Sequence, residues 1–235
     1  MKKTEKLLQK IKDDYNQIAS HFSQTRVMPW TEFGLFKEYI KPGQKILDLG
    51  CGNGRWYKFL IDQHLPVEYY GLDNSEQLIK VAKETYSNEA ARFILGELTK
   101  LNFPENSFEV VVCIATLHHL PSRQLRQQAI AEIYRVLKPG GYFLMTNWYL
   151  WNTVNFKNYF NCFWQKSSFK DFFIPWKDPQ GNVLSQRYYY AFTKRKLAKL
   201  LQTANFKVER NFSQSRQKKS GKAKGVNLVS IARKE

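Results

Sequence analysis

Three glycines at alternate positions follow a short apolar run in the stretch Lys45-Ile46-Leu47-Asp48-Leu49-Gly50-Cys51-Gly52-Asn53-Gly54. The run predicts a strand, the glycines predict a tight turn, and residues 55–64 predict a helix. Because glycine carries no side chain, such a turn leaves backbone N–H groups and the positive end of the following helix open to a ligand. We therefore expect a ligand over residues 50–54, although a turn that serves only packing would need the same glycines.

Asp73 ends a second strand-like run, residues 67–72, roughly 20 residues beyond the turn. A carboxylate at this place can accept hydrogen bonds from both ribose hydroxyls of an adenosine. The alternative is that Asp73-Asn74-Ser75 caps the helix that begins near residue 76. Taken together, the turn and the acid favour a ligand that contains a nucleoside.

A dinucleotide-type turn would place its third glycine at position 55, where this chain has Arg. The spacing G-x-G-x-G after Asp48 resembles motif I of the class I S-adenosylmethionine (SAM) methyltransferases instead. This resemblance implies SAM as cofactor and an α/β fold, with a doubly wound, mostly parallel sheet and an antiparallel final strand. It also implies that the cofactor contacts Asp48, Gly50, Gly52, Gly54, Asp73, Asn74, Glu97, Leu98 and Ile114.

The family often carries an Asp after its third strand, here residues 92–95, to bind the adenine amino group. Gly96-Glu97-Leu98 stands at that place in this chain. Glu97 could do the same work with one more methylene, or it could face solvent. The missing Asp also leaves open a catalytically silent nucleic-acid-binding protein that keeps the fold.

With 235 residues and 43% hydrophobic content, the chain predicts one folded domain over residues 1–235. No apolar run approaches the roughly 18 residues that cross a bilayer, and the first residues lack the apolar core of a signal peptide. We therefore expect a cytoplasmic protein without membrane contact. Cys51, Cys113 and Cys162 suggest neither a disulfide framework nor a zinc site, so no metal is expected.

The net charge of +17 is unevenly distributed along the chain. Residues 151–235 contain 18 Lys and Arg against 4 Asp and Glu, whereas residues 1–150 contain 19 against 16. A solvated surface explains part of this excess, but the asymmetry favours a polyanionic partner, with nucleic acid as the leading candidate. The cations of segment 214–225, which include Lys218 and Lys219, suit phosphate binding or form only a mobile hairpin tip.

Apolar residues recur at helical spacing over 4–22, and a second helix over 32–40 is expected, so residues 1–40 predict a helical cover. Segment 15–26, YNQIASHFSQTR, together with Pro29-Trp30, resembles the entry segment of a tRNA methyltransferase family. These enzymes esterify 5-carboxymethyluridine at the anticodon wobble position. The resemblance implies tRNA as a partner through its anticodon loop. Relatives in that family also work with a small zinc-containing activator subunit, and the sequence leaves open whether this chain needs one.

An apolar run over 108–115 predicts a central parallel strand, and Thr116-Leu117-His118-His119 follows its carboxyl end, where ligands bind in such sheets. We expect one of the two histidines to line the active site, although His118 could cap the next helix and His119 could merely pack. That helix is predicted over 122–137 and a fifth strand over 142–147. Residues 133–141, IYRVLKPGG, resemble many class I methyltransferases, including enzymes of quinone pathways.

Sixteen of the 36 aromatic residues lie between Trp148 and Phe192, interleaved with cations and without a regular period. We interpret residues 149–192 as an insertion after the fifth strand that folds over the cofactor site. Rings beside cations can stack unpaired bases, although most of these rings would serve equally as a satellite core. Trp148 is the ring best placed for a ligand, and Arg187 with the tyrosines after it resembles an Arg-Tyr-Tyr of the wobble-uridine family. Residues 206–212 and 226–232 predict a closing antiparallel pair.

A carboxymethyl group on uridine is ionised at neutral pH, so its methylation needs no general base. It needs a cation that orients the carboxylate, and a guanidinium can do so with two parallel hydrogen bonds. Arg26 holds the family's Thr-Arg position, although it could instead grip the methionine carboxylate of SAM or pair with a surface acid. The runner-up function is a small-molecule C- or O-methyltransferase with His118 or His119 as base. The catalytic candidates are Arg26 and His118, and the substrate-side candidates are Tyr15, Trp30, His119, Trp148, Arg187, Lys218 and Lys219.

Overall fold

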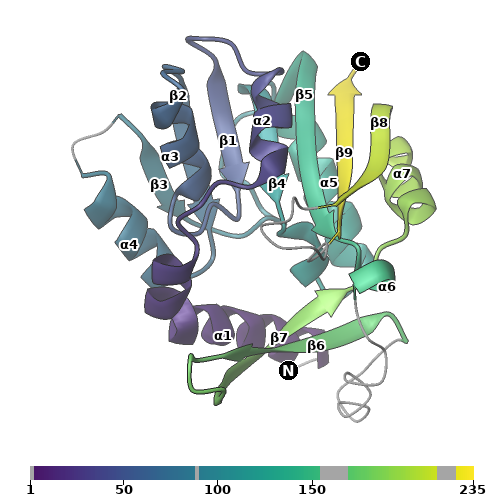
Figure 1. The fold of residues 1–235 in the computed structure, drawn as a ribbon. Helices are drawn as coiled ribbons and strands as arrows, with labels where there is room; N and C mark the ends of the chain where they lie inside the picture. Colours follow the sequence, from purple (N-terminus) through teal and green to yellow (C-terminus); the bar gives the residue numbers. More distant parts are fainter. Residues whose placement is uncertain (1–2, 88–89, 154–168, 216–225) are drawn as a thin grey trace.

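The computed structural model describes residues 3–87, 90–153, 169–215 and 226–235. Within these residues, seven strands form one sheet in the order β3-β2-β1-β4-β5-β9-β8 (Figure 1). Strands β1 to β5 are parallel, whereas β9 lies between β5 and β8 and runs antiparallel to both. The predicted α/β fold with a mostly parallel sheet and an antiparallel final strand is confirmed. The strands are β1 Lys45–Leu49, β2 Glu68–Asp73, β3 Arg92–Leu95, β4 Phe108–Ile114, β5 Leu137–Trp148, β8 Phe206–Ser215 and β9 Val226–Lys234.

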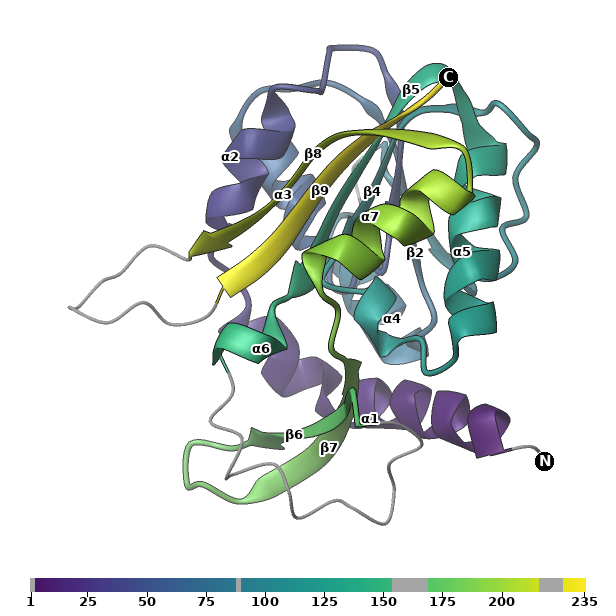
Figure 2. The same ribbon diagram turned by 90° about the vertical axis from the view of Figure 1, so that its right-hand side faces the viewer.

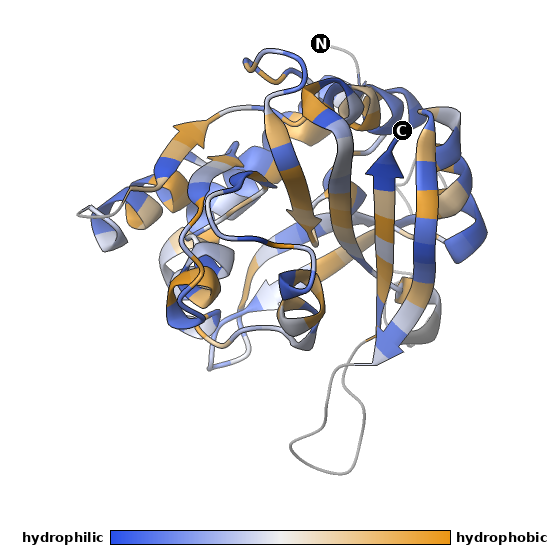
Figure 3. Cartoon of the chain, turned by 90° about the horizontal axis from the view of Figure 1, so that it is seen from above, coloured by the Kyte–Doolittle hydropathy of each residue, from blue (hydrophilic) through white to orange (hydrophobic). Residues whose placement is uncertain are grey.

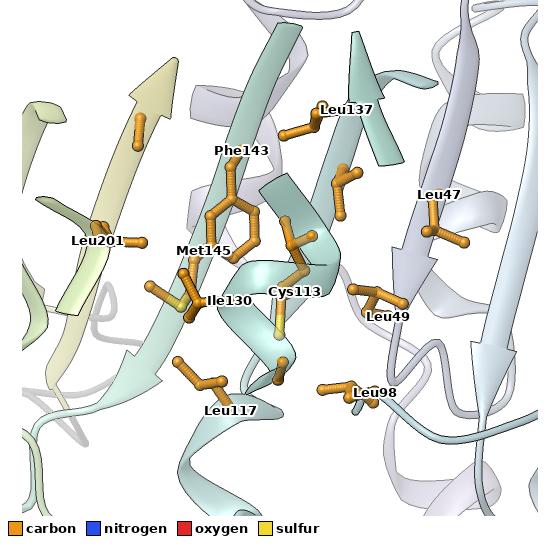
Figure 4. Close-up of a cluster of buried hydrophobic side chains, with 14 of the residues drawn as sticks. Leu47, Leu49, Leu98, Cys113, Leu117, Ile130, Leu137, Phe143, Met145 and Leu201 are labelled. Carbon is orange, nitrogen blue, oxygen red and sulfur yellow. The ribbon is translucent and has the colours of Figure 1, made fainter. Parts of the chain in front are cut away.

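Helices cover both faces of this sheet, as Figure 2 shows for α2 on one side and α5 and α7 on the other. Side chains of successive strand residues point to opposite faces, so each parallel strand feeds two apolar cores. In Figure 4, Ile130 packs against Cys113, Phe143 and Met145 in the core beneath α5. Figure 3 shows that the central strands are largely apolar along their length. The helices on one face are α2 Thr31–Lys37, α3 Arg55–Asp62 and α4 Glu76–Thr85, and those on the other are α5 Arg123–Val136 and α7 Lys194–Thr203.

Hydroxyl side chains fix where three of these helices begin. Ser75, Ser122 and Thr193 each accept a hydrogen bond from the backbone N–H three residues further on, at 3.2, 3.1 and 3.3 Å. Each bond satisfies one of the donors that the first turn of a helix leaves without a partner. The first turns of α4, α5 and α7 are thereby held in place.

A cover lies across the carboxyl ends of the parallel strands, below the sheet in Figure 1. It consists of the long helix α1 Lys3–Thr25 and an antiparallel hairpin, β6 Asp171–Lys177 and β7 Val183–Tyr190. Lys10 Nζ donates to the carbonyl of Gln186 at 3.3 Å, which ties α1 to β7. The cover is thus built from parts of the chain that are far apart in sequence.

Some element boundaries differ from those predicted. α1 continues past residue 22, and α2 ends at Lys37 instead of residue 40. β5 begins before residue 142 because Leu137 already pairs with Phe108. The hairpin was not predicted, since residues 149–192 show no regular period and were interpreted only as an insertion that folds over the cofactor site.

Two short elements follow the carboxyl ends of central strands. These are the single 3₁₀ turn η1 Leu117–His119 after β4, and α6 Leu150–Thr153 after β5. Lys218, Lys219 and residues 154–168 of the predicted insertion lie outside the described residues. None of the helices in the described ranges is long and apolar enough to cross a membrane.

Candidate functional site

A cleft separates the carboxyl ends of β1, β2, β4 and β5 from the cover, and its empty volume, open solvent at its mouth included, is about 1160 Å³. Gly54 does not line the cleft, and Lys218 and Lys219 lie outside the described residues. The predicted site residues that do line it are Tyr15, Arg26, Trp30, Asp48, Gly50, Gly52, Asp73, Asn74, Glu97, Leu98, Ile114, His118, His119, Trp148 and Arg187.

The glycine turn requires residues without a side chain, both for its backbone φ angles and for the space around it. Gly50, Gly52 and Gly54 all have left-handed φ angles, of 73°, 56° and 79°, which glycine adopts without strain. A Cβ atom on Gly50 would lie 2.2 Å from Thr116 Oγ1, so the turn after β1 can only approach the end of β4 without a side chain. A Cβ atom on Gly54 would lie 2.6 Å from the Tyr86 ring, so this glycine is explained by packing at the start of α3.

The carboxylate of Asp73 is fixed by the backbone. It is 8% exposed, and its two oxygens accept hydrogen bonds from Gly52 N–H and Ser75 N–H, each at 2.9 Å. Burial raises the pKa of Asp73, while these two bonds oppose the rise. Since each carboxylate oxygen has two lone pairs, the side chain can still accept from the two hydroxyls of a ribose. The alternative that residues 73–75 cap the next helix is also correct, because Ser75 is the N-cap residue of α4.

Glu97 stands beside this carboxylate. Burial raises the pKa of Glu97, and a hydrogen bond from the Asn74 side chain opposes the rise. Both side chains line the cleft at the ends of β2 and β3. Glu97 is nevertheless an exposed residue, so its carboxylate faces both solvent and the cleft.

Asp48 is the buried acid of the first strand. It is 2% exposed, and Tyr69 Oη donates to its Oδ2 at 2.6 Å. Burial raises the pKa of Asp48 to about 7, against the effect of that hydrogen bond. A cation that binds in the cleft near Asp48 would favour the ionised form, which suits the amino and sulfonium groups of SAM.

Neither histidine offers a free lone pair to a substrate in its neutral form. His119 Nδ1 lies 2.7 Å from the carbonyl of Tyr188, which can only accept, so Nδ1 carries the proton and Nε2 accepts from Tyr15 Oη at 2.9 Å. Burial lowers the pKa of His119 to about 3, which keeps the ring neutral. His118 Nδ1 accepts from Trp148 N–H at 3.2 Å, so the proton of the neutral ring is on Nε2.

Two arginines lie at the same end of the cleft. The guanidinium carbons of Arg26 and Arg187 are 4.7 Å and 4.6 Å from the centroid of the Trp176 ring. Burial lowers the pKa of Arg26, and the charge of Arg187 lowers it further. Among the described residues, neither arginine is in an ion pair with a carboxylate. The charge of Asp14 acts on Arg187, yet two cations held this close together would be stabilised further by a bound anion.

Sequence reasoning missed several residues of the lining. Tyr189 stacks on Trp148, with ring centroids 4.8 Å apart and an interplanar angle of 19°. Arg55 lies over the Trp30 ring at 4.6 Å, at the start of α3. The signal for Tyr189 was its alternation with Arg187 along β7, and the signal for Arg55 was its place directly after the glycine turn.

Comparisons with known proteins agree with this geometry. A methyltransferase-domain family model matches residues 47–145. The chain is 29% identical over 208 residues to the tRNA (carboxymethyluridine(34)-5-O)-methyltransferase of Schizosaccharomyces pombe, which covers 81% of this chain and 85% of that protein. It is 36% identical over 134 residues to the Arabidopsis thaliana protein of the same name, over 57% of this chain but only 31% of that longer protein.

Solved structures show the same fold. A SAM-dependent methyltransferase from Methanosarcina mazei has a TM-score of 0.71 and 25% identity, over 85% of this chain and 96% of that chain. A Haloferax volcanii methyltransferase, solved in complex with the Trm112 methyltransferase activator, has a TM-score of 0.67 over 95% of this chain and 96% of that chain. Its 16% identity supports the fold alone.

The sheet order, the glycine turn and the placement of Asp73 define a class I SAM-dependent methyltransferase, and the chain is an enzyme of that class with SAM as cofactor. The predicted class of enzyme and the predicted cofactor are both confirmed. Within the class it resembles the tRNA (carboxymethyluridine(34)-5-O)-methyltransferases, as the segment around Arg26 predicted.

Proposed function

We propose that this enzyme transfers the methyl group of SAM to the carboxylate of a carboxymethyl-type modified uridine at the wobble position of tRNA. The activity after which the S. pombe and A. thaliana relatives are named supports this substrate. The excess of cations in residues 151–235 suits a polyanion.

The observation that carries the proposal is the pair Arg26 and Arg187, which both line the cleft and both lie over the ring of Trp176. A guanidinium binds a carboxylate with two parallel hydrogen bonds, and a second guanidinium nearby can donate to the lone pairs that remain. Arg187 is 5% exposed, and neighbouring Tyr189 and Tyr15 outweigh the effect of burial and raise the pKa of Arg187, so the cation persists. A neutral acceptor would offer these two cations no negative charge.

Methyl transfer to an ionised carboxylate requires correct positioning of the two reactants and no proton transfer. SAM, when bound, supplies an activated methyl group, and an ionised carboxylate is already a nucleophile. Asp73 and Glu97 would hold the adenosine, and Asp48 lies where a cationic group would be favoured. Arg26 and Arg187 would orient the acceptor carboxylate, while the stacked Trp148 and Tyr189 rings would flank the base.

A small-molecule C- or O-methyltransferase is supported less well. That chemistry removes a proton from the acceptor and needs a general base within hydrogen-bonding reach. The lone pair of His119 is engaged by Tyr15, and the lone pair of His118 is engaged by the backbone of Trp148. Neither ring is therefore arranged as a base.

Two finer points belong to the proposal. A small zinc-containing activator subunit is predicted from the family resemblance, and co-expression with and without such a subunit, followed by measurement of yield and activity, tests it. A cytoplasmic location is likewise a prediction, which imaging of the tagged full chain would test.

The proposed reaction can be tested with purified protein, labelled SAM and tRNA that carries 5-carboxymethyluridine at the wobble position. The matched control is the same tRNA with the neutral carbamoylmethyl group. We expect label in the methyl ester of the first nucleoside and none in the second, measured by mass spectrometry of digested tRNA. Equal labelling of both, or labelling at another nucleotide, would overturn the proposal.

A further inference from the structure

A second group of cations lies away from the cleft, where α5, α7 and the start of β6 meet. In Figure 2 the helices α5 and α7 lie side by side on this surface. The α7 sequence KRKLAKLLQT contains four cations and no acid, and all four are exposed. We call the group the α5–α7 patch, and it consists of Arg123, Arg126, Lys170, Lys194, Arg195, Lys196 and Lys199.

Backbone and ring contacts bring these segments together. Ala191 N–H donates to the carbonyl of Lys170 at 2.8 Å, which places Lys170 next to the chain that enters α7. Arg126 is 6% exposed, lies over the Tyr190 ring at 3.6 Å and donates to the carbonyl of Leu120 at 2.6 Å. The patch is thus a fixed part of the fold.

The cations of the patch repel one another. The Lys170 side chain lies against Lys196, and this contact is the largest of the causes that lower the pKa of Lys196. Asp171 is 1% exposed, accepts from the hydroxyl of Tyr188 at 2.7 Å and opposes the lowering of the Arg126 pKa by burial, whereas the cations of α7 lie at the exposed side of the patch. The exposed cations therefore face solvent together, an arrangement that a polyanion would stabilise.

Strand β7 separates the patch from the cleft. Successive strand residues point to opposite faces, so Arg187 and Tyr189 line the cleft whereas Tyr188 and Tyr190 lie on the other face. Because Arg126 stacks on Tyr190, the patch begins on the opposite face of β7 from the cleft. A nucleic acid that places one base in the cleft would carry its backbone onto this surface.

We propose that the α5–α7 patch binds backbone phosphates of the tRNA stem that continues from the nucleotide held in the cleft. This inference rests on the proposed function. Contacts of this kind are independent of sequence, position the substrate and make affinity depend on salt.

The test compares two triple variants that lose the same charge. One is Lys170→Ala, Arg195→Ala and Lys196→Ala in the patch. The control is Lys58→Ala, Lys80→Ala and Lys83→Ala, which are exposed on α3 and α4 at the opposite face of the sheet. The affinity for tRNA is measured over a series of salt concentrations, and the affinity for SAM is measured by calorimetry as a check on folding.

We expect the patch variant to bind tRNA at least tenfold more weakly at low salt, with a log–log salt slope that is shallower by about 2 to 3, since each lost phosphate contact removes just under 1. Its SAM affinity should equal that of the wild type, and the control should behave as the wild type throughout. Equal effects of both triple variants, or unchanged tRNA affinity in the patch variant, would overturn the patch alone. A wild-type protein that methylates no tRNA would overturn the proposed function itself.

Discussion

Tyr15 of α1 donates its hydroxyl to Nε2 of His119 across 2.9 Å, and the same imidazole donates to the carbonyl of Tyr188 in β7. One ring therefore connects the helix of the cover, the hairpin of the cover and the turn after β4. Tyr15 and His119 both line the cleft, so their hydrogen bond fixes the position of the cover relative to the ends of the parallel strands.

Replacement of Tyr15 by Phe is expected to lower the free energy of unfolding by about 1 to 3 kcal/mol, because it leaves the buried Nε2 of His119 without a donor. Chemical denaturation measures this change. Tyr134→Phe is the matched control, since its hydroxyl makes only an exposed 3.5 Å contact with the carbonyl of Glu235. Equal stability of the two variants would show that the Tyr15 contact contributes nothing.

Replacement of Arg26 or Arg187 by Lys is expected to lower kcat by roughly 10² to 10³, because an ammonium cannot provide the bidentate contact that orients a carboxylate. Affinity for SAM, measured by calorimetry, should not change. Arg210→Lys is the control, as it exchanges an exposed guanidinium 4.8 Å from the Phe212 ring. A parallel loss of SAM affinity would assign the arginine to the cofactor instead.

Asp73→Asn should weaken SAM binding by roughly 10- to 100-fold, which corresponds to the loss of about 1.5 to 3 kcal/mol in charge-assisted hydrogen bonds. Calorimetric titration of the purified variant provides the measurement. Asp62→Asn removes an exposed carboxylate that pairs with Lys58 and should bind SAM normally. Wild-type affinity in Asp73→Asn would remove the ribose contact from the site.

The raised pKa of Asp48 makes stability depend on pH. Its value of about 7 in the folded chain exceeds the ordinary value near 4, so between about pH 4 and 7 the folded state binds more protons than the unfolded state. Stability contributed by this group is thus fully present below about pH 4 and is lost as the pH rises to 7. We expect Asp48→Asn to match the wild type at pH 4 and to exceed it by a few kcal/mol at pH 8, by denaturant titration; no difference at pH 8 would contradict the shift.

Gly50→Ala should be strongly destabilising, by more than about 2 kcal/mol, because its Cβ atom would overlap Thr116 and its φ of 73° is unfavourable for alanine. Thermal or denaturant unfolding gives the value. Gly34→Ala is the matched control. Its Cβ atom would meet nothing within 4 Å in the helix α2, so this change should be neutral or slightly stabilising. The reverse order of the two variants would contradict the close approach at Thr116.

The parts of the site that follow strands were predictable from the sequence. Asp48, Asp73 and Trp148 each end or interrupt an apolar run, and parallel strands bring their carboxyl ends to one edge of the sheet. The glycine spacing then indicated which strand carries the turn. Local sequence patterns were therefore sufficient to predict which residues line the cleft at the ends of the parallel strands.

The contacts within the cover could not be predicted from local sequence patterns. The β6–β7 hairpin is a two-stranded sheet with buried rings on both faces, so its residues show no polar and apolar alternation to identify it as strand. Trp176 lies far from Arg26 and His21 in sequence, and only the packing of α1 against the hairpin brings them together. The hydrogen bonds that engage both histidines likewise depend on tertiary contacts with Tyr15 and the Trp148 backbone.

The position of β9 has a consequence for how this chain is made. β9 follows β8 along the chain, yet β8 reaches the sheet only by pairing with β9. A polypeptide whose translation stops before Val226 lacks β9. The edge of β5 would then be unpaired, and the residues of β8 would have no strand to pair with in the sheet. Such edges recruit strands from other molecules, so a prematurely ended product should aggregate and be degraded instead of persisting as a half-active enzyme.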